Sequence, residues 1–256
     1  MTERQEPLPL FRMEQGSGGV PLVLLHGFGA SHAAWTDILD LIGPLRHTIA
    51  FDLPGHGRSL AAPHGSAAIA ARAVIGELDR LEIRRAHLAG HSMGGAAAAL
   101  AALMQPDRVA SLTLLAPGGF GREINHRLLR RYAAATEEGG IALLLEQFFG
   151  WERELPDGLA AALARDRQAP GARDALMRIV ESFFDGNHQK VLAVGDLARL
   201  AIPIKVIWGT QDRVLPTRQA HRLPGRIGVH IFEGTGHMLP LEIPAEAANL
   251  LMENTR

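Results

Sequence analysis

The sequence of 256 residues contains no cysteine. Disulfide bonds, thiolate nucleophiles, zinc sites built on cysteine and iron–sulfur clusters are therefore all excluded. A G-x-x-x-x-G-K-[ST] phosphate loop, a complete dinucleotide-binding fingerprint and an H-E-x-x-H metal-binding pair are also missing from the sequence. We accordingly expect neither a metal site nor a cofactor.

An excess of charge of either sign is also lacking. Twenty-six basic residues stand against 27 acidic ones, a net charge of −1, whereas a nucleic-acid-binding surface needs a basic field. The longest run of apolar and small residues, Gly94–Met104, is far shorter than the roughly 20 residues that cross a bilayer. The N-terminal stretch MTERQEPLPL lacks the apolar region of a signal peptide. We expect no nucleic-acid partner, no membrane span and a cytoplasmic location, and the oligomeric state stays open.

Short apolar runs alternate with helical patterns along the chain. Six runs have strand length: Val20–Leu25, His47–Phe51, Ala86–Ala89, Ser111–Ala116, Ile204–Trp208 and Val229–Phe232. Such runs are typical of strands buried on both faces of a parallel sheet. The pattern predicts an α/β fold, a mostly parallel central sheet flanked by helices, with the functional groups at the carboxyl ends of the strands.

One long segment, residues 120–196, breaks this alternation. It shows helical patterns without a buried strand, and it is too long for a simple connection. We predict that it forms an inserted helical cap over a core domain made of residues 1–119 and 197–256. Gly139-Gly140, between two of its helical patterns, is a predicted hinge because glycine tolerates large backbone changes.

The predicted cap holds seven of the thirteen aromatic residues of the chain. Buried aromatic side chains usually serve packing, and most of these are expected to fasten the cap to the core. Two or three of them are expected to line an apolar substrate pocket. The residues predicted for this pocket are Phe148, Phe149 and Trp151 in the cap, and Met238 in the last loop.

The stretch Gly90-His91-Ser92-Met93-Gly94 has the form G-x-S-x-G and lies between a predicted strand and a predicted helix. In that context, a serine sits on a strained turn that exposes its Oγ, and the flanking positions must be glycine because side chains would collide there. The following helix also directs its free N–H groups at the site. Ser92 is therefore the predicted nucleophile.

Two later loops each deliver a side chain that could complete a catalytic triad. Asp212 follows the fifth strand run and His237 follows the sixth. Alone, Asp212 could be a turn former and His237 a surface residue. In chain order, however, Ser92, Asp212 and His237 follow the nucleophile–acid–histidine order of α/β-hydrolases. Asp52, in the loop DLPGHGRS, has the context of a turn.

The loop His26-Gly27-Phe28-Gly29 follows the first strand run. It could be a plain glycine turn. It could also present the backbone N–H of Phe28 to the nucleophile, where the N–H of Met93 would supply a second donor. We predict that these two N–H groups form an oxyanion hole.

The chain resembles the α/β-hydrolase superfamily, in its branch of small, capped serine hydrolases. The resemblance rests on VLLHGFGAS, FDLPGHGRS, LAGHSMGG, PIKVIWGTQDRVLP and FEGTGHMLPLEIP. It implies the fold and the triad, but esterases, lactonases, carbon–carbon bond hydrolases and cofactor-free haloperoxidases share these motifs. The catalytic-like domain of some lipoyl-bearing acyltransferases is similar as well. Serine at position 92 disfavours the branches with an aspartate nucleophile, and HGFG departs from the H-G-x-G-P-G style of carbon–carbon bond hydrolases.

These observations predict a serine hydrolase that cleaves a carboxylic ester, or a related acyl bond, of a small and largely apolar substrate. One alternative is hydrolysis of a carbon–carbon bond in a vinylogous diketone. Another is a small-ligand receptor that retains a vestigial triad.

Overall fold

The computed structural model describes residues 8–256, except the side chain of Leu45. Residues 1–7, which belong to the predicted core domain and to the N-terminal stretch considered above, lie outside the described part. The described residues form a seven-stranded sheet in the order β1-β3-β2-β4-β5-β8-β9. The strands are β1 (Arg12–Gln15), β2 (Leu22–Leu25), β3 (Thr48–Phe51), β4 (Ala86–His91), β5 (Val109–Leu115), β8 (Ile204–Gly209) and β9 (Gly228–Phe232).

The predicted mostly parallel sheet flanked by helices is confirmed. All neighbouring strands pair in parallel except β1 and β3, which pair antiparallel with Arg12 opposite Phe51. The sequence of β1, RMEQ, is polar and lies at the sheet edge. It lacks the apolar run typical of a buried strand, so sequence analysis did not predict it.

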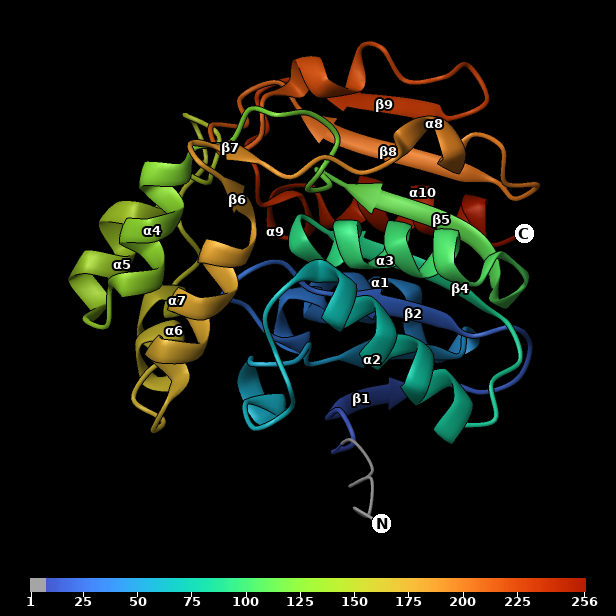
Figure 1. Cartoon of the computed structure of the whole chain (residues 1–256), viewed down its shortest axis with the longest axis horizontal. Helices are drawn as coiled ribbons and strands as arrows, with labels where there is room; N and C mark the ends of the chain where they lie inside the picture. Colours follow the sequence, from blue (N-terminus) through green and yellow to red (C-terminus); the bar gives the residue numbers. More distant parts are fainter. Residues whose placement is uncertain (1–7) are drawn as a thin grey trace.

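Helices cover both faces of the sheet. Figure 1 shows α2 (Ala67–Arg80) and α3 (Met93–Met104) in front of it, and α1 (Thr36–Ile42) and α10 (Pro244–Asn254) behind it. The α3 sequence, MGGAAAALAALM, is rich in alanine and glycine, and most of its side chains are buried. Small side chains allow a close approach between helix and sheet, which brings the first turn of α3 against the strand ends.

The prediction that both faces are buried is wrong for the last strand, β9. Val229 and Ile231, which point to the same face, are 39% and 41% exposed. The reason is its place at the edge of the sheet, where it pairs only with β8. An edge strand leaves one face partly open to solvent even when its sequence is apolar.

Residues 120–196, which we call the cap segment, are mainly helical. Its helices are α4 (His126–Ala134), α5 (Glu138–Leu145), α6 (Leu159–Asp166) and α7 (Ala172–Ser182), and α8 (Val194–Leu197) lies at its end. The short α9 (Leu239–Glu242) lies outside this segment and precedes α10. Figure 1 shows α4–α7 gathered at the carboxyl end of the parallel strands. The division into core and cap at residues 120 and 196 stays a prediction.

Two details of the cap segment differ from the sequence-based prediction. It contains a small hairpin of β6 (Phe184–Asp185) and β7 (His188–Gln189), whose strands are too short to leave a periodic signal. Gly139-Gly140 lies in the first turn of α5, not between two helices, because glycine, though a poor helix former, is tolerated at a helix start. The hinge prediction is therefore wrong in its premise.

Candidate active site

The nucleophile candidate, Ser92, occupies a sharp turn between β4 and α3. Its backbone has φ 52° and ψ −112°, a region that costs a non-glycine residue about 1–3 kcal/mol. A Cβ at Gly94 would collide with the carbonyl oxygen of Leu25, and one at Gly90 would collide with the carbonyl group of Gly94. Only glycine fits at either position, and this close backbone packing holds Ser92 in its strained conformation.

The structure brings Ser92, His237 and Asp212 into one chain of hydrogen bonds. The Ser92 Oγ lies 2.9 Å from His237 Nε2, and His237 Nδ1 lies 2.8 Å from Asp212 Oδ2. The side chains of His237 and Asp212 are almost completely buried. A carboxylate only accepts hydrogen bonds, so His237 Nδ1–H donates to Asp212, and Nε2 is free to accept the Ser92 proton.

Asp212 is held by donors on both of its oxygens. Its Oδ1 accepts the backbone N–H groups of Val214 and Leu215, both at 2.8 Å, and its Oδ2 accepts the indole N–H of Trp208 at 3.0 Å. These bonds compensate for the burial of the charge and fix the carboxylate opposite His237.

A second histidine lies beneath this chain. His91 is buried, and its Nε2–H donates to the carbonyl oxygen of His237 at 2.7 Å. Burial, together with the nearby His237, lowers the pKa of His91 to about 3. His91 therefore stays neutral near pH 7 and supports the His237 loop without adding charge.

The loop after β2 passes beside the nucleophile. A Cβ at Gly27 would lie 3.4 Å from Ser92 Cβ. No acceptor among residues 8–256 receives the Phe28 N–H. The Met93 N–H lies in the first turn of α3, where N–H groups have no partner inside the helix. Both donors predicted for the oxyanion hole are thus available, and this role stays a prediction.

Two buried histidines fasten this loop to the loop after β3. His26 Nδ1–H donates to Gly27 O at 2.7 Å while its Nε2 accepts Leu53 N–H at 2.9 Å. His56 Nε2 accepts Gly29 N–H at 3.0 Å. Burial lowers the pKa of His26 to about 4 and that of His56 well below its usual value. Both rings remain neutral, as their acceptor roles require.

Asp52 has a structural place apart from Ser92 and His237. Its Oδ1 accepts the backbone N–H and the ring Nδ1–H of His32, both at 2.7 Å, and its Oδ2 accepts Arg58 N–H at 2.8 Å. These bonds hold the loop DLPGHGRS in its turn, and they engage both oxygens of the carboxylate.

Glu242 is a residue that sequence reasoning missed. Its buried carboxylate accepts three backbone N–H groups: Gly150 at 2.8 Å and Gly236 at 2.9 Å on Oε2, and Met238 at 3.0 Å on Oε1. Next to it, His237 N–H donates to Phe148 O at 2.6 Å. Glu242 thus ties the cap segment to both neighbours of His237. The one signal in the sequence is a lone acid in the apolar run MLPLEIP.

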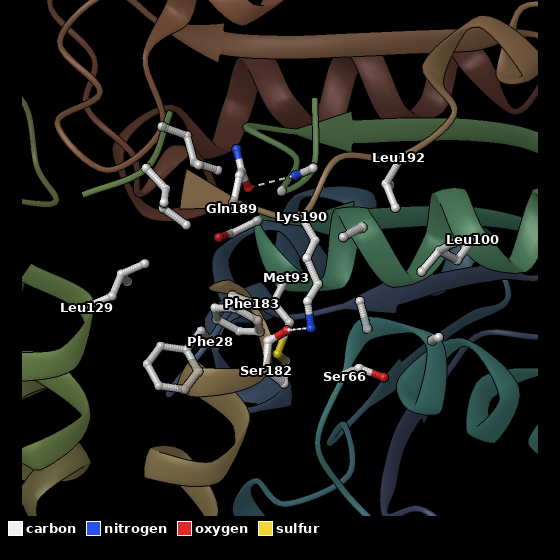
Figure 2. Close-up of a pocket in the computed structure, with 18 of the residues that line it drawn as sticks. Phe28, Ser66, Met93, Leu100, Leu129, Ser182, Phe183, Gln189, Lys190 and Leu192 are labelled. Carbon is white, nitrogen blue, oxygen red and sulfur yellow. Dashed lines mark hydrogen bonds between the residues drawn. The ribbon is translucent and has the colours of Figure 1, made fainter. Parts of the chain in front are cut away.

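Ser92 lies where two cavities meet. The larger has a volume of about 190 Å³ and the smaller about 140 Å³, and Phe28, Ser92 and Leu129 line both. Figure 2 shows the larger cavity, with Phe28, Phe183 and Leu129 around one end and Leu100 and Leu192 around the other. Both linings are mostly apolar, so the site suits a substrate with two apolar arms that meet at the reacting carbon.

The structure brings only two of the four predicted pocket residues to these cavities. Phe148 and Met238 line the smaller one. Phe149 is fully buried in the core and Trp151 is 74% exposed, and neither lines either cavity. The predicted pocket role of Phe149 and Trp151 is therefore wrong. Neighbouring residues of one loop point in different directions, so only Phe148 of this aromatic run reaches the cavity.

Within residues 8–256, no three histidine, aspartate or glutamate side chains gather in a way that could hold a metal ion. No helix in the same part of the chain is long and apolar enough to cross a membrane. The cytoplasmic location stays a prediction.

Comparison with known proteins gives a family match, two curated relatives and a solved structure. The model of a family described as "Alpha/beta hydrolase family" matches residues 22–250. A dihydrolipoyllysine-residue acetyltransferase component of an acetoin cleaving system from Pseudomonas putida is 34% identical over 238 residues. That match covers 93% of this chain but 63% of the relative, so the chain spans less than two thirds of that protein.

A 2-hydroxy-6-oxononadienedioate/2-hydroxy-6-oxononatrienedioate hydrolase from Escherichia coli K12 is 30% identical over 257 residues, covering 93% of this chain and 88% of the relative. Among solved structures, a membrane phospholipase A described as a bacterial virulence factor superposes with a TM-score of 0.80 at 26% identity. The superposition covers 98% of this chain and 86% of the phospholipase.

Proposed function

This chain belongs to the alpha/beta hydrolase family, and from that premise we propose that it is a serine hydrolase that cleaves carboxylic esters of small, largely apolar substrates. The observation that carries the proposal is the hydrogen-bonded chain Asp212–His237–Ser92, which ends where two apolar cavities meet. An ester has an acyl arm and an alcohol arm on either side of its carbonyl carbon, and two cavities can hold them.

The proposed reaction begins when His237 Nε2 takes the proton of Ser92 and Oγ attacks the carbonyl carbon. The N–H groups of Phe28 and Met93 stabilise the oxyanion of the tetrahedral intermediate. Asp212 holds the tautomer of His237 and stabilises the imidazolium. His237 then protonates the leaving alkoxide, and a water molecule, activated by His237, hydrolyses the acyl-enzyme.

A second candidate, hydrolysis of a carbon–carbon bond in a vinylogous diketone, is supported by the relative from Escherichia coli, whose name describes a hydrolase of such dienedioates. The phospholipase supports the ester, because its name describes an ester hydrolase. The same Ser92 and His237 could serve either reaction, so the substrate has to be tested directly.

A steady-state panel of nitrophenyl esters of rising acyl length, run beside a ring-cleavage product, tests the proposal. We expect multiple turnovers on the esters and an optimum chain length, because the cavities are finite. A kcat/KM at least tenfold higher on the ring-cleavage product would favour carbon–carbon bond hydrolysis. Release of one product per protein molecule, with no further turnover, would favour the third alternative, a small-ligand receptor that retains a vestigial triad.

Glu242→Gln tests whether the hydrogen bonds from the His237 loop and Gly150 to Glu242 matter for catalysis. Glutamine keeps the size but places an NH₂ where one oxygen now accepts backbone N–H groups, so at least one of these donors loses its partner. We expect kcat to fall roughly 5- to 30-fold, because about 1–2 kcal/mol of transition-state stabilisation is lost with the positioning of His237, while KM changes little.

The matched control is Glu246→Gln, since Glu246 is exposed on α10. Kinetics with nitrophenyl acetate and thermal unfolding of both variants provide the measurements. A Glu242→Gln variant that loses stability but keeps the wild-type kcat would show that these hydrogen bonds stabilise the fold without positioning His237 for catalysis.

A further inference from the structure

The larger cavity contains one charged side chain. Of the described residues that line it, Lys190 alone carries a charge, and the others are apolar or neutral. Lys190 directly follows β7, where its backbone N–H donates to Phe183 O at 2.9 Å. Figure 2 shows its side chain extending along the cavity, with the amine beside Ser182 and near Met93.

The Lys190 amine has more N–H donors than acceptors among the described residues. It donates to Ser182 O at 3.0 Å, whereas an ammonium group carries three N–H bonds. Among residues 8–256, no carboxylate lies within ion-pair distance of it. Lys190 is an exposed residue that lines an apolar cavity, and its charge has no counter-ion from the described part of the chain.

Two of the other polar side chains of this lining, Gln189 and Ser182, are already engaged. Gln189 accepts Gly119 N–H at 2.8 Å and donates to Glu123 O at 3.1 Å. The hydroxyl of Ser182 donates its one O–H to Ile179 O at 2.6 Å. Lys190 is therefore the group best able to bind a polar end of a substrate whose apolar part fills the cavity.

We propose that Lys190 makes the enzyme selective for esters in which the arm that occupies the larger cavity ends in a carboxylate. Half-esters of dicarboxylic acids, or acyl esters of hydroxy acids, have this chemistry. The apolar lining holds the methylene chain, and the ammonium pairs with the carboxylate in a charge-assisted hydrogen bond. This inference rests on the proposed ester hydrolysis at Ser92.

The test compares substrates that differ only in the terminal group. Monomethyl adipate is paired with methyl hexanoate for the acyl arm, and 6-acetoxyhexanoic acid with hexyl acetate for the alcohol arm. We expect the wild-type enzyme to favour the charged member of one pair, and we expect Lys190→Met to lower kcat/KM for that member roughly 10- to 100-fold. The neutral member should be unaffected, and Lys190→Arg should retain the preference.

Lys205→Met is the matched control, because Lys205 lies on β8 and pairs with Glu253 at 2.7 Å. An equal loss of kcat/KM on charged and neutral esters in Lys190→Met would overturn the proposal. Lys190 would then only stabilise the β6–β7 hairpin. A wild-type enzyme that shows no preference in either pair would also overturn the proposal.

Calorimetric binding of hexanoate and of the neutral hexanamide separates this inference from the proposed function. If no ester is hydrolysed but hexanoate binds more tightly than hexanamide, and Lys190→Met removes the difference, the ester proposal fails and the anion site stands. If esters are hydrolysed but hexanoate has no advantage over hexanamide, the anion site fails alone.

Discussion

Replacement of Ser92 by alanine should abolish ester hydrolysis and leave the fold intact. The variant removes the Oγ that lies 2.9 Å from His237 Nε2 and keeps the Cβ, so the turn between β4 and α3 is unchanged. By analogy with serine proteases, kcat should fall by about 10⁶-fold. Labelling by a fluorophosphonate, which reacts with an activated serine, should disappear completely.

The control is Ser66→Ala, because Ser66 lines the larger cavity but makes no hydrogen bond to His237. Intact-protein mass spectrometry measures the label, and thermal unfolding checks the fold. Wild-type protein that is fully folded but resists the fluorophosphonate would remove the basis of the serine hydrolase proposal.

Replacement of Asp212 by asparagine should give the second largest loss. Asparagine can keep an oxygen for the N–H groups of Val214 and Leu215, but its NH₂ then faces both His237 Nδ1 and the indole N–H of Trp208. His237 would take the wrong tautomer and present N–H to Ser92. A loss of about 10⁴-fold in kcat, or ~5 kcal/mol of barrier, is expected from the serine-protease precedent, with a much smaller change in KM.

Two other aspartates serve as controls for this variant. Asp52→Asn should lower stability more than kcat, because Asp52 holds the loop after β3. Asp196→Asn should change neither, because Asp196 is exposed and pairs with Arg199. A near-wild-type kcat for Asp212→Asn together with a collapse for either of the others would reassign the acid.

The sheet and the grouping of Ser92, Asp212 and His237 could be predicted because both leave strong local signals. Buried parallel strands appear in the sequence as apolar runs, and the loops after them contain the glycines and the polar residues of the site. The polar strand β1 has no such signal: its place depends on antiparallel pairing with β3. The exposure of β9 depends on its position at the sheet edge, which the apolar sequence alone does not specify.

The residues around Ser92, Asp212 and His237 were harder to predict because their roles depend on distant backbone groups. Glu242 accepts an N–H from Gly150, 92 residues away in sequence, and nothing local marks that contact. Phe148 and Trp151 illustrate the same difficulty, since composition marks both as pocket residues while the direction of each side chain is set by the fold. Lys190 carries no signal in the sequence, because its role depends on a cavity that segments far apart in the chain build around it.

The strained turn at Ser92 means that catalytic ability is maintained at the expense of folding stability. The φ of 52° raises the free energy of the native state by about 1–3 kcal/mol, and alanine at this position would inherit that cost because it keeps a Cβ. Glycine alone could relax it, yet glycine cannot attack a carbonyl carbon. Selection for greater thermal stability at position 92 would therefore work directly against activity, and any compensating gain must come from elsewhere in the chain.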